Sequence, residues 1–335
     1  MPAVSTLPPL DWHVLFTHWE VQPVWDAVLL AALAAYIYGL VLARRRGTGG
    51  LHPVRVLSYV AGLVVLAITL NSAIQIYSRM LFWDHMVQHL LLIMVVPSLF
   101  VLGHPLTLIA QVSQGRAHDA VLAVLGSRPV SLLTHPLIGL AIYTVVIVAT
   151  HLTQFMNLMA TQVWAHQLET VIYLAGGYLF LLPLLGDEPI RWRPPYMTRI
   201  FILFVGMAPD TVVGIVLMQA THAMFPAMAA QRPDWAPGAV RDLQIGGGIM
   251  WAFGDGLMMA FLLGLIVAFL ANTEGNTTAG RWLEGVRRQN LAHQLGMDTG
   301  ETGGLDTGVE VDEDEAILAA YNQMLERMNR REQQP

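Results

Sequence analysis

The chain has 335 residues, of which 55% are hydrophobic and only 13% are charged. Soluble domains carry about 25% charged residues, so this composition excludes an ordinary soluble domain and indicates an integral membrane protein. The chain has no Cys and its 18 basic residues are all Arg. These counts exclude disulfides, thiolate metal ligands and any mechanism that needs a Lys Schiff base.

Seven apolar segments are long enough to cross a bilayer, because about 20 apolar residues span its hydrocarbon core. In chain order they cover residues 24–43, 56–76, 84–102, 132–153, 166–185, 199–222 and 247–270. We therefore predict an all-α integral membrane protein with seven transmembrane helices. The apolar stretch 106–126, between the third and fourth spans, is interrupted by polar residues, and we expect an interfacial helix there.

The predicted domain organisation follows from the composition. Residues 1–23 form an outer N-terminal segment, and residues 24–272 form the seven-helix membrane domain. Gly, Thr, Asn and Asp dominate residues 273–311, a composition typical of a flexible linker. Apolar residues recur at helical spacing within 312–335, which predicts a short amphipathic cytoplasmic helix.

The arginines predict the orientation, because cytoplasmic loops of membrane proteins are enriched in basic residues. If the N-terminus lies outside, only Arg79, Arg232 and Arg241 fall on the outer side, and the other 15 of the 18 fall on the inner side. We therefore predict an outer N-terminus and a cytoplasmic C-terminus.

Five histidines from four spans are predicted to lie at the outer membrane surface. His85 and His89 are one helical turn apart at the outer end of the third span, so both imidazoles face the same side. His151 ends the fourth span, His166 begins the fifth and His222 ends the sixth. An ionisable residue within a span is a functional-site hypothesis by default, so we predict a metal site with these five ligands. The alternative is that each is an interfacial histidine that is hydrogen-bonded and idle.

Copper is the predicted metal, because imidazole and thioether ligands without thiolate suit copper, Cu(I) in particular, better than they suit hard cations. Seven methionines are predicted at the same surface: Met80, Met86, Met156, Met159, Met218, Met224 and Met228. Three polar side chains near the histidines in sequence, Glu169, Asp84 and Gln88, are expected to accept the second N–H of ligating imidazoles and so to orient them.

Two acids lie deeper in the predicted spans. Asp210 is in the middle of the sixth span and Asp255 is in the seventh, and no arginine lies within a span to pair with them. They are candidates for relaying protons or balancing the charge of a metal. The alternative is that each is a protonated carboxyl group hydrogen-bonded to a neighbouring helix.

Several motifs resemble those of the CtaG family, which are bacterial membrane factors for the assembly of caa3-type cytochrome c oxidase. The matching segments are His85-Met86-Val87-Gln88-His89-Leu90-Leu91-Leu92, Val96-Pro97, Leu102-Gly103 before Pro105, Trp164-Ala165-His166-Gln167-Leu168-Glu169, Leu185-Gly186-Asp187-Glu188-Pro189, and Asp242 with Gln244 ahead of Gly246-Gly247-Gly248-Ile249-Met250-Trp251. The resemblance covers about residues 20–275.

The resemblance implies a role in oxidase maturation at the copper-insertion stage, in a bacterial plasma membrane. The implied partners are cytochrome c oxidase subunits or other assembly factors, and membrane lipid; no nucleic acid and no enzymatic activity are expected. Two other functions stay open. One is a haem-binding electron-transfer protein, because histidines of facing helices can ligate haem. The other is a copper or proton transporter with Asp210 and Asp255 along the route.

Overall fold

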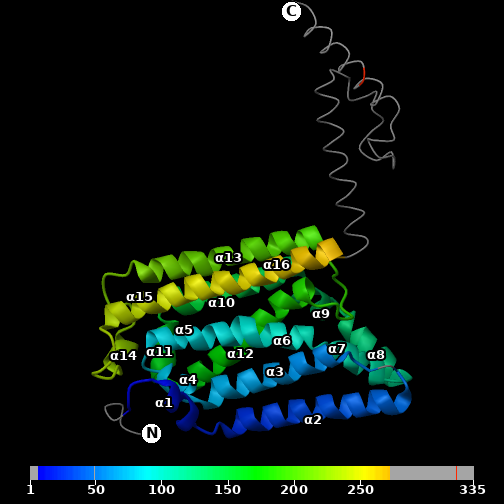
Figure 1. The fold of residues 1–335 in the computed structure, drawn as a ribbon, viewed down its shortest axis with the longest axis horizontal. Coiled ribbons are helices and arrows are strands. Elements are labelled where there is room, and N and C mark those ends of the chain that lie inside the picture. Colours follow the sequence, from blue (N-terminus) through cyan, green and yellow to red (C-terminus); the bar gives the residue numbers. More distant parts are fainter. Residues whose placement is uncertain (1–6, 49, 272–321, 323–335) are drawn as a thin grey trace, which may run out of the picture. The chain divides into compact units, whose positions relative to one another are not determined.

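The computed structural model describes residues 7–48, 50–271 and 322, and every regular element among them is a helix (Figure 1). The chain divides into two units, Met1–Leu265 and Ile266–Pro335. The first unit holds the helices discussed below, except for the end of the last one. The predicted linker 273–311 and tail helix 312–335 lie outside the described residues, apart from Asn322.

Six helical runs of the described chain are long and apolar enough to cross a membrane, and a bent pair of helices makes a seventh. The six are α2 (Pro23–Arg46), α3 (Pro53–Asn71), the run Phe82–Val112, α12 (Val163–Leu185), α13 (Tyr196–Met218) and the run Ala239–Ala271. The pair is α10 (Pro136–Leu152) with α11 (Phe155–Thr161), bent by 71°. The predicted all-α membrane protein is therefore confirmed, with seven spans when the bent pair counts as one.

Two of these runs are built from shorter pieces. The run Phe82–Val112 comprises α5 (Phe82–Leu90), a π-helical turn (Leu91–Val95), α6 (Val96–Leu102) and α7 (Pro105–Val112). The run Ala239–Ala271 comprises α15 (Ala239–Ile249), a second π-helical turn (Met250–Gly254) and α16 (Asp255–Ala271). The remaining short helices are α1 (Trp12–Thr17), α4 (Ala73–Tyr77), α8 (Arg116–Leu125), α9 (Arg128–Leu133) and α14 (Pro226–Ala230).

Local sequence explains where the spans begin and end. Helix α2 has Pro23 in its first turn, where a missing N–H costs nothing, and it stops at Gly47, whose φ of +66° favours glycine. Helices α3 and α10 begin at prolines too, and each is capped by a histidine. His52 accepts from the N–H of Val54, and His135 accepts from the N–H of Leu137. These two histidines therefore have a structural role.

The structure differs from the predicted boundaries at several places. The second span, predicted to reach residue 76, ends at Asn71, because Ser72 caps the separate helix α4. The stretch 106–126 forms two helices, α7 and α8, because Gly115, with a φ of +53°, separates them. The sixth span ends at Met218 and leaves His222 beyond it. The last span begins at Ala239 rather than at residue 247, because a mixed apolar and polar turn that includes Arg241 and Asp242 continues the helix in front of the glycines.

A buried carboxylate supports the start of α7. Glu188, in the segment after α12, accepts hydrogen bonds from the backbone N–H groups of Leu106 (3.1 Å) and Thr107 (2.7 Å) and from the Thr107 hydroxyl (2.6 Å). Burial raises the pKa of the Glu188 carboxyl, and these hydrogen bonds oppose the rise. The carboxylate replaces intrahelical partners that the first N–H groups of any helix lack.

Close helix contacts bring α12 against both of its main neighbours. A Cβ atom on Gly177 of α12 would lie 1.9 Å from the carbonyl oxygen of Ile93, in the π-helical turn after α5. A Cβ atom on Gly139 of α10 would lie 2.8 Å from the carbonyl oxygen of Leu179 on α12. Small residues of this kind let membrane helices approach closely. In Figure 1 the start of α5 and the helices α11 and α14 lie at the same end of the bundle.

We expect Gly177→Ala to destabilise the protein by about 1–3 kcal/mol, because the added methyl group overpacks the contact with Ile93. The measurement is the thermal unfolding midpoint of the full chain in detergent. Gly256→Ala is the matched control, since a Cβ atom on Gly256 of α16 would meet nothing within 4 Å. Both changes gain the same helix propensity, so equal midpoints for the two variants would contradict the packing argument.

Candidate metal centre

Four of the five predicted histidines meet in the interior of the helix bundle. His85 and His89 come from α5, His151 from the end of α10 and His166 from the start of α12, and all four are buried. The ring centroids of His85 and His89 are 3.9 Å apart, and those of His89 and His151 are 5.1 Å apart. The structure thus brings four of the five predicted histidines together, and their place at the outer membrane surface stays a prediction.

Glu169 lies at the centre of the histidines. Its Oε1 atom is 3.2 Å from Nε2 of His89 and 3.6 Å from Nε2 of His85. Its Oε2 atom is 3.5 Å from Nδ1 of His166, one helical turn earlier on α12. The donor atoms of His85, His89 and Glu169 all lie within 4.8 Å of one another. Glu169 was predicted only to orient a ligating imidazole, whereas its position makes it a candidate ligand beside His85 and His89.

The facing donor atoms are incompletely satisfied. Within the described part of the chain, Nε2 of His85, Nε2 of His89 and Oε1 of Glu169 are buried and have no hydrogen-bond partner. Buried polar groups without partners are rare and costly, and a carboxylate inside an apolar bundle needs a compensating positive charge. Two imidazole nitrogens and a carboxylate oxygen are ordinary ligands of a transition-metal ion. The residues present therefore fit a metal ion at this point.

His151 forms a hydrogen bond with His89 and not with Glu169. Nδ1 of His89 is 3.1 Å from Nε2 of His151, and Nδ1 of His151 is 2.8 Å from the carbonyl oxygen of Ile147. The hydroxyls of Thr150 and Tyr173 lie beside the same Nδ1 atom, at 3.1 and 3.4 Å. No spacing pattern in the sequence points to Thr150 or Tyr173 as a neighbour of this histidine.

Gln88 and Gln75 form a polar connection to His166. Nε2 of Gln88 donates to the carbonyl oxygen of Thr69 (3.3 Å) and to Oε1 of Gln75 (2.5 Å). Nε2 of Gln75 is in turn 3.0 Å from Nε2 of His166. Gln88 was expected to bond directly to an imidazole. In the structure its contact with His166 is indirect, because Gln75 of the short helix α4 lies between the two side chains.

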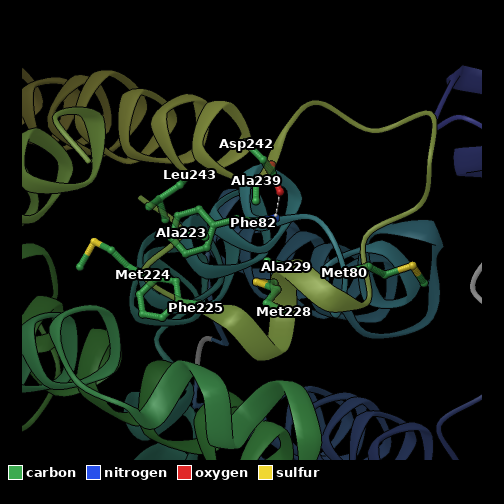
Figure 2. Close-up of a pocket in the computed structure, with 10 residues that line it drawn as sticks. All are labelled: Met80, Phe82, Ala223, Met224, Phe225, Met228, Ala229, Ala239, Asp242 and Leu243. Carbon is green, nitrogen blue, oxygen red and sulfur yellow. Dashed lines mark hydrogen bonds between the residues drawn. The ribbon is translucent and has the colours of Figure 1, made fainter. Parts of the chain in front are cut away.

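Asp242 holds the start of the helix that carries His85 and His89. Its two carboxylate oxygens accept hydrogen bonds from the N–H groups of Phe82 (2.9 Å) and Trp83 (3.0 Å), the first two residues of α5. Figure 2 shows Asp242 above Phe82 with this bond drawn. This role was not predicted from the sequence, because the cap joins residues 160 positions apart. Asp84 is buried on α5, and its Oδ2 atom has no hydrogen-bond partner among the described residues.

Three of the seven methionines predicted at this end line the pocket beside Asp242. Met80, Met224 and Met228 line that pocket together with Phe82. In Figure 2 the sulfur atoms of Met80 and Met224 lie at opposite ends of the pocket. The pocket therefore presents separate thioethers rather than a joint set of ligands.

His222 is not brought to the buried histidines. It is exposed, in the segment between α13 and α14, because α13 ends at Met218. His222 was predicted at the site only because it was expected to end the sixth span. Helix α13 ends one turn before it, so His222 lies in the segment that follows.

The two intramembrane acids each have one hydroxyl partner. Asp210 accepts from the Tyr143 hydroxyl, and Asp255 accepts from the Thr211 hydroxyl at 2.5 Å. The other carboxyl oxygen of each, Oδ1, is buried without a hydrogen-bond partner among the described residues. Helix neighbours thus hold both carboxyl groups, as one of the two sequence readings expects, and a proton-relay role stays a prediction.

One family model matches most of the chain. The model of the family described as cytochrome c oxidase caa3 assembly factor (Caa3_CtaG) matches residues 34–272, which include the whole histidine cluster. No solved structure matches the chain.

Three curated mycobacterial proteins are similar to the chain. Uncharacterized protein Mb0105 of Mycobacterium bovis and uncharacterized protein MT0111 of Mycobacterium tuberculosis are each 29% identical over 254 residues, which is 73% of this chain and 38% of the relative. Uncharacterized protein ML1998 of Mycobacterium leprae is 28% identical over 246 residues, 71% of this chain and 37% of the relative. The chain thus spans less than two fifths of the length of these relatives.

We expect Asp242→Ala to destabilise the protein by about 0.5–2 kcal/mol, the usual cost of losing a side-chain cap at a helix start. Asp242→Asn keeps one acceptor oxygen and should lose less. The measurement is the unfolding midpoint of the full chain in detergent. Asp119→Ala is the control, since Asp119 is an exposed acid in the first turn of α8. A midpoint that falls no further for Asp242→Ala than for this control would sink the capping role.

Proposed function

The chain belongs to the family of cytochrome c oxidase caa3 assembly factors, and from that premise we propose that it holds copper for the maturation of a cytochrome c oxidase. The ion binds at the cluster of His85, His89 and Glu169. The protein acts in a bacterial plasma membrane and meets oxidase subunits or other assembly factors there. It handles the metal and catalyses no reaction of its own.

The spacing of the unpaired donor atoms carries this proposal. Ligands that sit about 2.0–2.2 Å from one metal ion lie roughly 3–3.5 Å from each other. The 3.2 and 3.6 Å separations between Glu169 Oε1 and the two Nε2 atoms are of that size. A cation between these atoms would satisfy the unpartnered nitrogens and the buried carboxylate at once.

The choice of copper combines donor chemistry with family membership. Imidazole nitrogens suit copper, zinc, iron and nickel alike, so the ligands limit the choice to these metals without selecting one of them. The family's role in the assembly of a cytochrome c oxidase favours copper among these, at the stage where the oxidase receives its metal.

The compact arrangement argues against the haem alternative. Haem iron takes axial ligands on opposite sides of a wide macrocycle, whereas the Nε2 atom of His89 faces Glu169 directly at 3.2 Å. The rings of His85 and His89 are also in contact with each other, with their centroids 3.9 Å apart. A single small ion is therefore the better occupant.

Elemental analysis of the purified protein should find about one copper ion per chain after loading with a copper salt, and almost none in the double variant His85→Ala/His89→Ala. His222→Ala is the matched control and should keep the wild-type content, because His222 is exposed and outside the cluster. Copper retained in full by the double variant would show that the ion binds elsewhere.

In cells that depend on this protein, His89→Ala should lower cytochrome c oxidase activity several-fold while the variant still accumulates in the membrane. The reason is that His89 supplies a donor atom that faces Glu169. Activity is read as oxidation of reduced cytochrome c by membranes, and protein level by immunoblot. Normal oxidase activity at a normal level of the variant would contradict the assembly role of this site.

A further inference from the structure

We propose that the site binds copper as the cupric ion, through Nε2 of His85, Nε2 of His89 and a carboxylate oxygen of Glu169, while His151 and His166 stay outside the coordination shell. The two outer histidines act as positioning residues for His89 and Glu169. This inference rests on the proposed copper function and specifies its ligands and oxidation state.

The backbone around His151 determines which nitrogen of His89 is free. The carbonyl oxygen of Ile147 can only accept, so the 2.8 Å contact places a hydrogen on Nδ1 of His151. A neutral His151 then has a lone pair on Nε2, and this lone pair accepts from Nδ1–H of His89 at 3.1 Å. His89 in that tautomer carries its own lone pair on Nε2, the atom that faces Glu169. Hydrogen bonding thus aims the metal-binding nitrogen of His89 at the carboxylate.

Gln88 and Gln75 determine in the same way which groups donate and which accept in the hydrogen bonds that lead to His166. The carbonyl oxygen of Thr69 can only accept, so the amide of Gln88 must present its NH₂ group to it. The second hydrogen of that group goes to Oε1 of Gln75. Gln75 therefore presents its own NH₂ group to Nε2 of His166, which accepts at 3.0 Å.

His166 is then a donor toward the site rather than a ligand. With Nε2 accepting from Gln75, a neutral ring carries its hydrogen on Nδ1. This atom has no hydrogen-bond partner among the described residues, and it faces Oε2 of Glu169 at 3.5 Å, a distance of electrostatic contact. The other oxygen, Oε1, stays available beside His85 and His89. A histidine that holds a ligating carboxylate in this manner is a common arrangement around protein-bound metals.

Recruiting either outer histidine as a ligand would break a buried hydrogen bond. His151 would leave Nδ1–H of His89 without an acceptor, and His166 would leave the amide of Gln75 without one. Leaving either group buried without a hydrogen-bond partner is unfavourable. The resting arrangement therefore favours three protein ligands. Two nitrogens and an oxygen suit Cu(II), whereas Cu(I) prefers softer sulfur ligands.

Electron paramagnetic resonance of the full chain loaded with copper(II) sulfate tests this ligand set. We expect a cupric signal with hyperfine coupling to two directly bound nitrogens. His151→Ala should keep two coupled nitrogens while its affinity for Cu(II) falls about 10–100-fold, the usual effect of losing an outer partner of a metal ligand. His151→Gln, whose amide oxygen can accept from His89, should recover part of that affinity.

A second pair of variants tests the glutamine connection without touching a histidine. Gln75→Leu should weaken Cu(II) binding about 10–100-fold at an unchanged nitrogen count, because His166 and Glu169 lose their fixed orientation. Gln162→Leu is the matched control and should bind as the wild type does, since Gln162 is exposed and its side chain caps nothing.

The outcomes separate this inference from the function on which it rests. Three or four bound nitrogens that fall by one in His151→Ala would make His151 a ligand and overturn the inference. Copper that is bound in stoichiometric amount without any cupric signal would overturn it too, while leaving the copper function in place. Failure of the protein to bind copper in either oxidation state would sink both.

Discussion

A carboxylate buried among imidazoles is the constraint on which the rest of this structure depends. Glu169 lies between His85, His89 and His166 in the interior of a bundle of apolar helices. Removing such a charge from water is expensive unless a positive group compensates it. Among the described residues, the ion-pair contacts of Glu169 are with imidazoles, and Arg79, six residues before His85, pairs with Glu20 instead. Compensation therefore has to come from the imidazoles or from a bound cation. An ion bound at this point, as we propose, would stabilise the fold as well as serve the proposed function.

Three kinds of contact between the surrounding helices hold Glu169 and the histidines in place. Glycines on α12 and α10 remove side chains where backbones approach, so that α12 lies against the turn that follows α5. Asp242 of α15 anchors the start of α5 from across the bundle. Polar side chains from α4 and α10 then set the ring orientations. Each kind of contact acts on a different degree of freedom: helix separation, helix position and side-chain rotation.

Much of the site was predictable because helix ends place residues at known depth. The pair His85 and His89 follows from one turn of helix, and the alternation of span direction brings His151 and His166 to the same end. The role of Glu169 was underestimated, since spacing of three residues from His166 shows proximity to one histidine and says nothing of two others on α5. The same depth argument failed for His222, where a span predicted to reach residue 222 ends at Met218.

By itself the sequence determined the class of protein, the approximate spans and the chemistry of the available ligands. These properties depend on composition and on contacts within one helix, where hydrophobic length and a spacing of four residues are enough. The tertiary structure alone decided that Gln75 reaches His166, that Asp242 caps α5 and that His151 contacts His89 rather than Glu169. Such contacts depend on the rotation and separation of helices far apart in the chain, and no local pattern specifies either quantity.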